Sequence, residues 1–231
     1  MNKRSMTKAN HHESTSKKKY IVAATISGAV VAFAIAFWKQ IAALVLIIIL
    51  LIASMFSRPN VCEDIARYEE LRSGPNAAED YQDRWGMDES IWPQKITAEM
   101  DVKDYKMVYY NPWDAQYLGY LVVEYPKEQY DAEVKRLKDY KSTEYKGYYG
   151  VTGEEDYNLL AINADPYYGF IYAMTDDKNT IIYAEQVFCN YFMDLKYEKY
   201  MPKEYFLDGF NAKIDNPYAQ EHRRVLDEIA E

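Results

Sequence analysis

Residues 20–56 carry a single charged side chain, Lys39, and this feature constrains the chain more than any other. The stretch consists of two uncharged runs, 20–37 and 41–56. A membrane-spanning helix needs about 17–25 mainly apolar residues, so each run is near the lower limit for one crossing. One continuous helix would be roughly 55 Å long and would have to tilt by about 57° to fit the hydrocarbon core. We therefore expect residues 20–57 to be a transmembrane region.

A helical hairpin accommodates both apolar runs. Its helices would cover residues 20–38 and 41–57, and its turn at Trp38-Lys39-Gln40 would place a Trp and a Lys among the lipid headgroups. That turn lacks the Gly, Pro or Asn that usually marks one. The alternative is a single span near residues 36–56. A cleaved secretory signal is a third option, although the second run would still remain as an anchor.

Lys and Arg residues set the orientation, because their excess marks the cytoplasmic side of a membrane. Residues 1–19 hold six of them and are otherwise mainly polar, so we expect a disordered, basic, cytoplasmic N-terminus. With the hairpin, residues 58–231 return to the cytoplasm in a multi-pass protein of the plasma membrane. With the single span, the same residues are extracytoplasmic.

The charge of the chain is divided unevenly. Residues 1–58 have a balance of +7, whereas residues 59–231 hold 35 acids against 19 Lys and Arg, a balance of −16. This acidic balance disfavours nucleic acid as a partner, because phosphate contacts need a basic face. The layout, a lysine-rich start followed by apolar runs and an acidic, Tyr-rich domain, is similar to that of many bacterial membrane proteins.

The pattern of residues 58–231 predicts an α+β fold. Runs rich in Tyr, Val, Ile and Leu predict about six strands, because they alternate with turn residues and lie close together along the chain. These strands cover residues 104–110, 117–125, 145–151, 157–163, 168–175 and 180–188. Consecutive strands joined by short turns, such as residues 176–179, indicate an antiparallel sheet with helices packed on one face.

Three helices are expected around this sheet. Asn60 can cap one that runs to about residue 73, Pro126 opens one to about residue 140, and Asn216-Pro217 begins the last. In the middle helix Asp131 and Lys135 have the spacing of a four-apart ion pair.

Residue types that carry catalysis are scarce. Residues 59–231 contain one His, His222, which we expect on an exposed helix face, and two Cys. Cys189 lies in an apolar strand, where a thiol is usually a small core group. Cys62 and Cys189 should stay reduced in the cytoplasm but could pair outside it. Three glycines at 147, 150 and 153 indicate turns rather than a phosphate loop. No cofactor and no metal site are expected.

Aromatic residues are the remaining excess, since the domain holds 23 of the 24 Tyr. A Tyr ring combines an apolar face with a hydroxyl, which suits peptides and protein surfaces. Three short segments with aromatic residues stand at turns, where binding groups often lie. They give the candidate binding residues Trp113, Asp114, Tyr148, Tyr149, Tyr167 and Tyr168.

Two hypotheses of different classes follow. The first is a membrane-anchored, non-enzymatic interaction domain that binds a protein or peptide partner through an aromatic face. The second is a membrane-bound extracytoplasmic hydrolase that cleaves cell-surface polymers with paired carboxylates. A deep pocket with a buried acid pair would favour the enzyme, and a shallow aromatic face would favour the binder.

Overall fold

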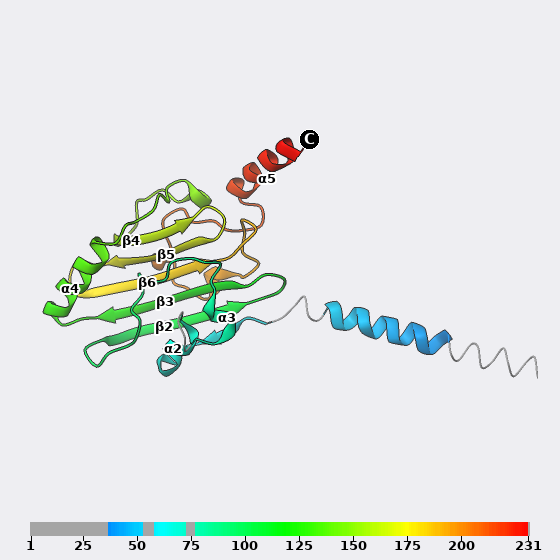
Figure 1. Cartoon of the computed structure of the whole chain (residues 1–231), viewed down its shortest axis with the longest axis horizontal. Helices are drawn as coiled ribbons and strands as arrows, with labels where there is room; N and C mark the ends of the chain where they lie inside the picture. The colour runs from blue at the N-terminus through cyan, green and yellow to red at the C-terminus, as the bar shows by residue number, and fades with distance from the viewer. Residues whose placement is uncertain (1–36, 53–57, 73–76, 231) are drawn as a thin grey trace, which may run out of the picture. The chain divides into compact units, whose positions relative to one another are not determined.

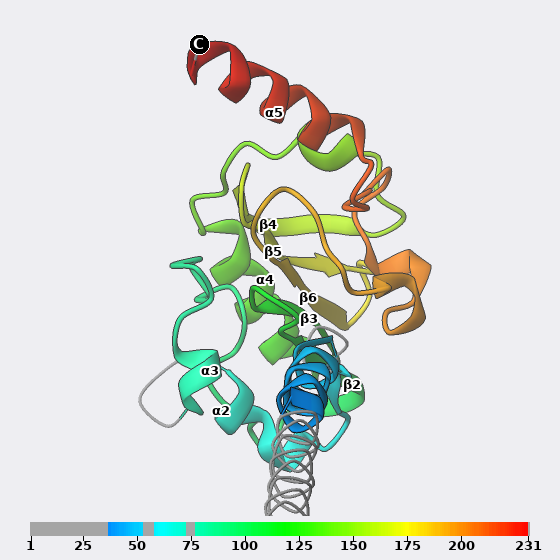
Figure 2. The same ribbon diagram turned by 90° about the vertical axis from the view of Figure 1, so that its right-hand side faces the viewer.

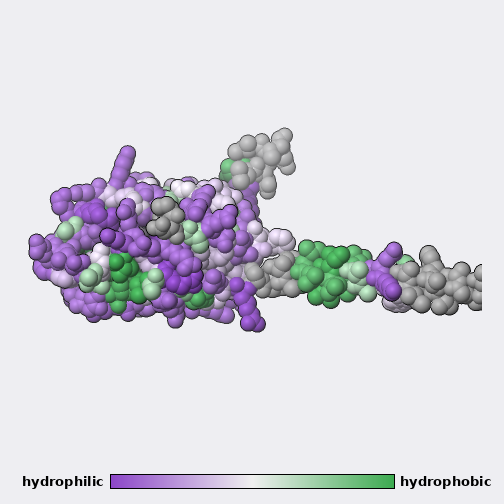
Figure 3. Space-filling view, turned by 60° about the horizontal axis from the view of Figure 1, so that its bottom comes forward, coloured by the Kyte–Doolittle hydropathy of each residue, from purple (hydrophilic) through white to green (hydrophobic). Residues whose placement is uncertain are grey.

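The computed structural model describes residues 37–52, 58–72 and 77–230. They belong to two compact units, 1–56 and 57–231, and each is described here by itself. In the first unit, residues 37–52 form one helix whose surface is hydrophobic over most of its length (Figure 3). Residues 38–40, where a turn was expected, are part of that helix. The first apolar run up to residue 36 and the basic N-terminus lie outside the described residues. Within the described ranges, no helix combines the length and the apolar character needed to cross a membrane.

The second unit is an α+β domain around one antiparallel sheet, as the sequence predicts (Figure 1). The strands are β1 (Asn60–Cys62), β2 (Asp101–Tyr110), β3 (Gln116–Glu124), β4 (Asn158–Asp165), β5 (Gly169–Thr175) and β6 (Thr180–Val187). Their order across the sheet is β1-β2-β3-β6-β5-β4. Every pair of neighbours is antiparallel. The hairpin predicted at residues 176–179 is present between β5 and β6, and residues 111–115 join β2 to β3.

Secondary structure covers both faces of the sheet, so the prediction of helices on one face is wrong (Figure 2). On one face lie α2 (Tyr68–Leu71), α3 (Glu79–Gln82) and α4 (Lys127–Lys138), whose buried side chains join one apolar cluster. On the other lie η2 (Tyr148–Gly150), η3 (Tyr197–Lys199), η4 (Lys203–Tyr205) and the start of α5 (Pro217–Ala230). Two-sided cover explains why β3, β5 and β6 are buried almost throughout.

Local signals predict two helices correctly. Pro126 precedes α4, and Tyr130 and Leu137 point into the core. The exposed ion pairs of α4 differ from the predicted one, because Lys127 pairs with Asp131 and Lys135 pairs with Asp139. At the start of α5, Asn216 Oδ1 accepts a hydrogen bond from the Ala219 N–H at 2.7 Å, as its capping role predicts.

Two predicted elements are wrong. Residues 60–73 do not form one helix: the first three pair with β2, and a short 3-10 turn, η1 (Ile65–Arg67), then leads into α2. Asp64, not Asn60, provides the side-chain cap, to the Ala66 N–H. Residues 145–151 are not a strand, because Gly147 and Gly150 have φ of 86° and 81° and turn the chain into η2. The sixth strand of the sheet is therefore β1 and not this segment.

The two cysteines are both buried and free. In the register of the sheet, Cys62 of β1 is opposite Met107 of β2. Met107 is opposite Gly119 of β3, and Gly119 is opposite Glu185 of β6. Three strand spacings of about 4.8 Å separate the strand of Cys62 from the strand that leads to Cys189, already about 14 Å. Disulfide formation needs Cα atoms within about 7 Å, so these thiols do not pair in this fold on either side of a membrane.

Candidate binding site at one end of the sheet

The strand order brings three connections to the same end of the sheet, which faces the viewer in Figure 2. They are the β2–β3 loop at residues 111–115, the β4–β5 turn at residues 166–168, and residues 188–192 after β6. The register explains this arrangement. Val187, the last residue of β6, is opposite Tyr117 near the start of β3 and opposite Gly169 at the start of β5. We call the side chains gathered there the aromatic end: Trp85, Trp113, Asp114, Tyr167, Tyr168, Asn190, Tyr191 and Tyr218.

Hydrogen bonds join two of the predicted residues across this end. The Tyr167 hydroxyl donates to Asn190 Oδ1 at 2.8 Å, and Asn190 Nδ2 donates to Asp114 Oδ2 at 2.6 Å. Asn190 therefore links the β2–β3 loop to the β4–β5 turn. Trp113, beside Asp114, is 69% exposed, which leaves its ring available to a partner.

Aromatic rings form a continuous series along the same end. Trp85 stacks on Tyr168 with ring centroids 6.0 Å apart and an angle of 5° between the planes, and its indole N–H donates to the Ala115 carbonyl at 3.0 Å. Tyr167 contacts Tyr168 and Tyr191 edge-on, with centroids 4.9 and 4.7 Å away. The predicted residues of the β4–β5 turn thus gain partners that sequence reasoning missed.

His222 also belongs to this series, which corrects its expected placement on a solvated helix face. Its ring lies 4.2 Å from that of Tyr218 and 5.1 Å from that of Tyr191, and it is half-buried. It therefore packs as another flat side chain at the aromatic end.

Backbone strain is concentrated at or directly beneath this end. Among the described residues, five that are not glycine have positive φ. One of them, Asp177, lies in the β5–β6 turn at the opposite end of the sheet. The other four are Trp85 at 56°, Tyr149 at 51°, Asn190 at 63° and Tyr191 at 65°. Left-handed conformations cost bulky residues such as Trp85, Tyr149 and Tyr191 about 1–3 kcal/mol each and concentrate at functional sites, whereas Asn190 adopts them more readily. This clustering is the strongest mark of a site in the domain.

Tyr149 supports the site instead of forming its surface, so its prediction as a binding residue is corrected. It is only 1% exposed, and its hydroxyl donates to the Pro166 carbonyl at 2.9 Å, beneath the β4–β5 turn. Its ring meets Phe188 edge-on at 5.0 Å, and burial raises the pKa of its hydroxyl. Its neighbour Tyr148 is half-buried and packs against Tyr218, 5.8 Å away.

The thiol at this end is not a nucleophile. Burial and the nearby Asp114 carboxylate raise the pKa of Cys189 to about 12, so the thiolate is not populated near neutral pH. Asn190 Nδ2 lies 3.2 Å from the sulfur, which is otherwise enclosed. Cys189 is buried as expected, but it lies two residues after the end of β6 and not within the strand.

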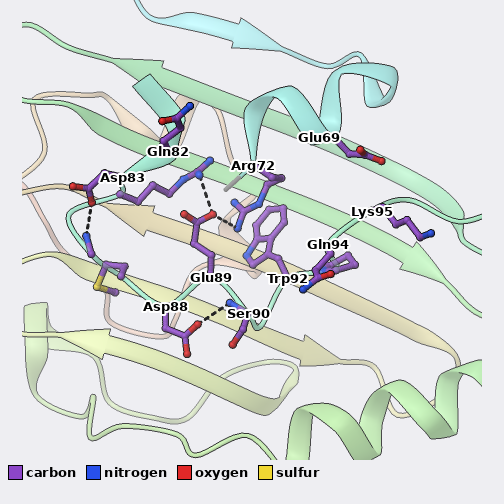
Figure 4. Close-up of a pocket in the computed structure, with 14 residues that line it drawn as sticks. Glu69, Arg72, Gln82, Asp83, Asp88, Glu89, Ser90, Trp92, Gln94 and Lys95 are labelled. Carbon is purple, nitrogen blue, oxygen red and sulfur yellow. Dashed lines mark hydrogen bonds and ion pairs between the residues drawn. The ribbon is translucent and has the colours of Figure 1, made fainter. Parts of the chain in front are cut away.

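A second feature, a cavity of about 590 Å³, lies under the irregular segment between α3 and β2 (Figure 4). Most of its lining comes from residues 82–95, and Glu69 and Arg72 complete it. Two arginines and Glu89 converge on its floor next to the Trp92 ring. The Arg72 guanidinium lies 4.1 Å above the centre of that ring.

Three lining residues, Arg72, Arg84 and Glu89, form a buried network of four charges with Glu185. Arg72 lies 2.6 Å from Glu185 and 2.7 Å from Glu89, and Arg84 lies 2.8 Å from Glu89 and 3.3 Å from Glu185. All four side chains are at most 6% exposed. Burial opposes the charge on Arg72, but the two carboxylates outweigh it and raise its pKa. Arg84 also donates to the Leu71 carbonyl at 2.5 Å and to the Tyr81 carbonyl at 3.2 Å, so the network fastens three segments together.

This network contains the buried acid pair that the hydrolase hypothesis requires, but each carboxylate is held between two guanidinium groups. Both oxygens of Glu185 and Oε2 of Glu89 lie in these ion pairs, an arrangement that suits stability better than proton transfer. Sequence reasoning missed the network, although a single acid in the apolar strand Thr180–Val187 is a signal that could have found Glu185.

Comparisons with known proteins found no relative of this chain. No family model matches it, and no curated protein or solved structure matches it either. Among the described residues, no group of three or more His, Cys, Asp or Glu side chains is arranged to hold a metal ion.

Proposed function

We propose that the protein is a membrane-anchored, non-catalytic interaction module that binds a protein partner through its aromatic end. The observation that carries this proposal is the concentration of left-handed Trp85, Asn190 and Tyr191 beside the exposed Trp113. A fold that accepts this cost at one end presents those rings and amides in a fixed arrangement, and aromatic groups dominate the energetics of protein interfaces.

Membrane anchoring is supported by the surface of the first unit. Residues 44–52 are nine consecutive Leu, Val and Ile residues with exposed side chains. Exposed apolar surface of this kind calls for lipid or protein cover. The uncharged residues of the sequence continue on both sides of them, from 20 to 56 with Lys39 as the one exception, so lipid is the cover that we propose.

The partner surface that fits the aromatic end is basic. Asp114 lies within that end, and Asp165 stands directly before the β4–β5 turn, where its Oδ1 accepts the backbone N–H of Tyr167 at 2.7 Å. The whole domain carries −16, so its field attracts cationic segments. Lys and Arg side chains also stack on Tyr and Trp rings, which makes a basic segment complementary in both charge and shape.

The first prediction concerns which side of the membrane holds the domain. The uninterrupted helix through residues 38–40 supports the single span over the hairpin, and the basic N-terminus then stays in the cytoplasm. An export-dependent reporter fused after Glu231 should therefore be active, and a cytoplasm-dependent reporter at the same position should be inactive. The reverse pattern would restore the hairpin.

The second prediction tests the aromatic end in the native membrane. A photoreactive amino acid at position 113 of the full chain should give a discrete crosslinked product with one protein, and the yield should fall as salt screens the acidic surface. Changing Tyr167 to Ala should reduce that yield at least about tenfold if the ring contributes as interface aromatics do.

The matched control places the same photoreactive group at position 157, a half-buried Tyr directly before β4 at the opposite end of the sheet. This position should give no such product. Equal products from positions 113 and 157, or a yield that does not respond to Tyr167→Ala, would contradict binding through the aromatic end.

A hydrolase remains the second candidate, and the observation that favours it is the cavity lined by Glu89, whose two arginine partners also hold Glu185. We rank it lower, because catalysis by paired carboxylates needs one of them to deliver a proton while both are here locked to Arg72 and Arg84.

A further inference from the structure

A small hollow of about 180 Å³ lies where the chain begins the domain. Pro59, which directly precedes β1, forms part of its wall together with Tyr110 at the end of β2. The rest of the wall comes from the segment that leads into η3 and follows it: Asp194, Leu195, Lys196, Lys199 and Tyr200. Segments far apart in the sequence thus meet beside the first residues of the domain.

The hollow is basic, in contrast to the domain around it. Lys196 and Lys199 in the lining, and Arg58, which directly precedes Pro59 in the chain, are exposed, and none of the three forms an ion pair within the part of the chain that the structure describes. Asp194 is the one acid in the lining, and its Oδ2 already accepts a hydrogen bond from Gln116 Nε2 at 3.1 Å. Two lysines against one acid in the lining, with Arg58 directly before Pro59 in the chain, give this place a positive balance within a domain whose overall charge is −16.

The length of the connecting chain limits how far this patch can lie from a bilayer. The apolar segment ends at Phe56, three residues before Pro59. Three residues span at most about 10 Å, which is about one Debye length at physiological salt. If the anchor ends at Phe56, this length keeps Arg58 and Pro59 within about 10 Å of its end, which is within reach of the lipid headgroups.

We propose that Arg58, Lys196 and Lys199 bind the phosphate groups of anionic lipid headgroups, and that this contact orients the domain on the bilayer. The inference rests on the membrane anchoring proposed above. Tyr110 and Tyr200, half-buried in the same hollow, suit the interface because their rings are apolar and their hydroxyls are polar. The acidic remainder of the domain is repelled from the same lipids, so attraction at one place and repulsion elsewhere select one orientation.

The test uses the full chain in lipid nanodiscs of phosphatidylcholine, with and without phosphatidylglycerol, and measures amide hydrogen exchange of residues 194–200. Exchange should slow severalfold when phosphatidylglycerol is present. In the variant Lys196→Gln/Lys199→Gln that slowing should disappear, since each basic residue near an anionic surface changes the docked population about fivefold. A variant of equal charge, Lys127→Gln/Lys178→Gln, alters exposed lysines at the opposite end of the sheet and should keep the effect.

Two results would overturn the inference. One is exchange that does not depend on phosphatidylglycerol, or that both double variants change equally. The other is equal slowing by inorganic phosphate added to phosphatidylcholine nanodiscs, which would assign the patch to a free anion. Failure of the chain to incorporate into nanodiscs at all would instead contradict membrane anchoring, so the two proposals fail in different ways.

Discussion

The variant Glu185→Gln should lose about 3–5 kcal/mol of unfolding free energy, because it leaves a buried cation without its partner. Glu185 is completely buried in β6, opposite Ile171 of β5. Its carboxylate lies 2.6 Å from the Arg72 guanidinium and 3.3 Å from that of Arg84. The four charges of the network sum to zero, so removing one carboxylate leaves a net positive charge in the core. Urea denaturation of residues 57–231, followed by circular dichroism, measures the loss.

Two further variants make this prediction specific. Glu70→Gln removes a carboxylate of the exposed pair with Arg67 and should leave the urea midpoint nearly unchanged, since exposed pairs contribute little. The double variant Arg72→Met/Glu185→Gln removes one charge of each sign and leaves Arg84 with Glu89. It should lose less stability than the sum of the two single variants. Additive losses would mean that the four side chains do not act as a neutral network.

The elements that sequence reasoning predicts correctly are those with local causes. Pro126 fixes the start of α4, Asn216 caps α5, and the polar residues 176–179 join β5 to β6. Each depends on side chains within a few residues of the feature, so the sequence alone contains the information.

The elements that it misses have distant causes. β1 is three residues long and exists because β2 offers hydrogen-bonding partners 45–49 positions away along the chain. The buried network needs Arg72 and Arg84 to reach Glu185 across more than a hundred residues, and no local pattern encodes that meeting. The missed elements thus depend on tertiary contacts that a single sequence does not reveal.

The candidate site lies between these two cases. Turn chemistry identifies Trp113, Asp114, Tyr167 and Tyr168, and the antiparallel connectivity brings their two loops to the same end of the sheet. Burial then separates Tyr149 from that group, because its φ of 51° points the ring beneath the β4–β5 turn and not outward. Residue type and position in a turn predict the neighbourhood, whereas the backbone conformation decides which side chains are exposed.

Gly169→Ala should be the most damaging small substitution at the aromatic end. Gly169 begins β5 with φ of +99°, a conformation that side chains rarely adopt, and an added Cβ would lie 2.1 Å from the Gln186 carbonyl oxygen and 2.8 Å from the Phe188 ring. The oxygen belongs to the backbone of β6 and cannot turn aside, so β5 and β6 would have to separate. Strain and overpacking together should cost about 3 kcal/mol or more.

Gly147→Ala separates these two causes. Gly147 also has positive φ, +86°, but no atom lies within 4 Å of the position that a Cβ would take, so the variant carries backbone strain without a clash. It should lose about 1–2 kcal/mol, well below the loss at residue 169. Urea midpoints of the two variants give the comparison directly. Similar midpoints would show that β5 and β6 do not approach as closely as the structure places them, and the tight packing that holds the β4–β5 turn with its Tyr167 and Tyr168 would then have to be revised.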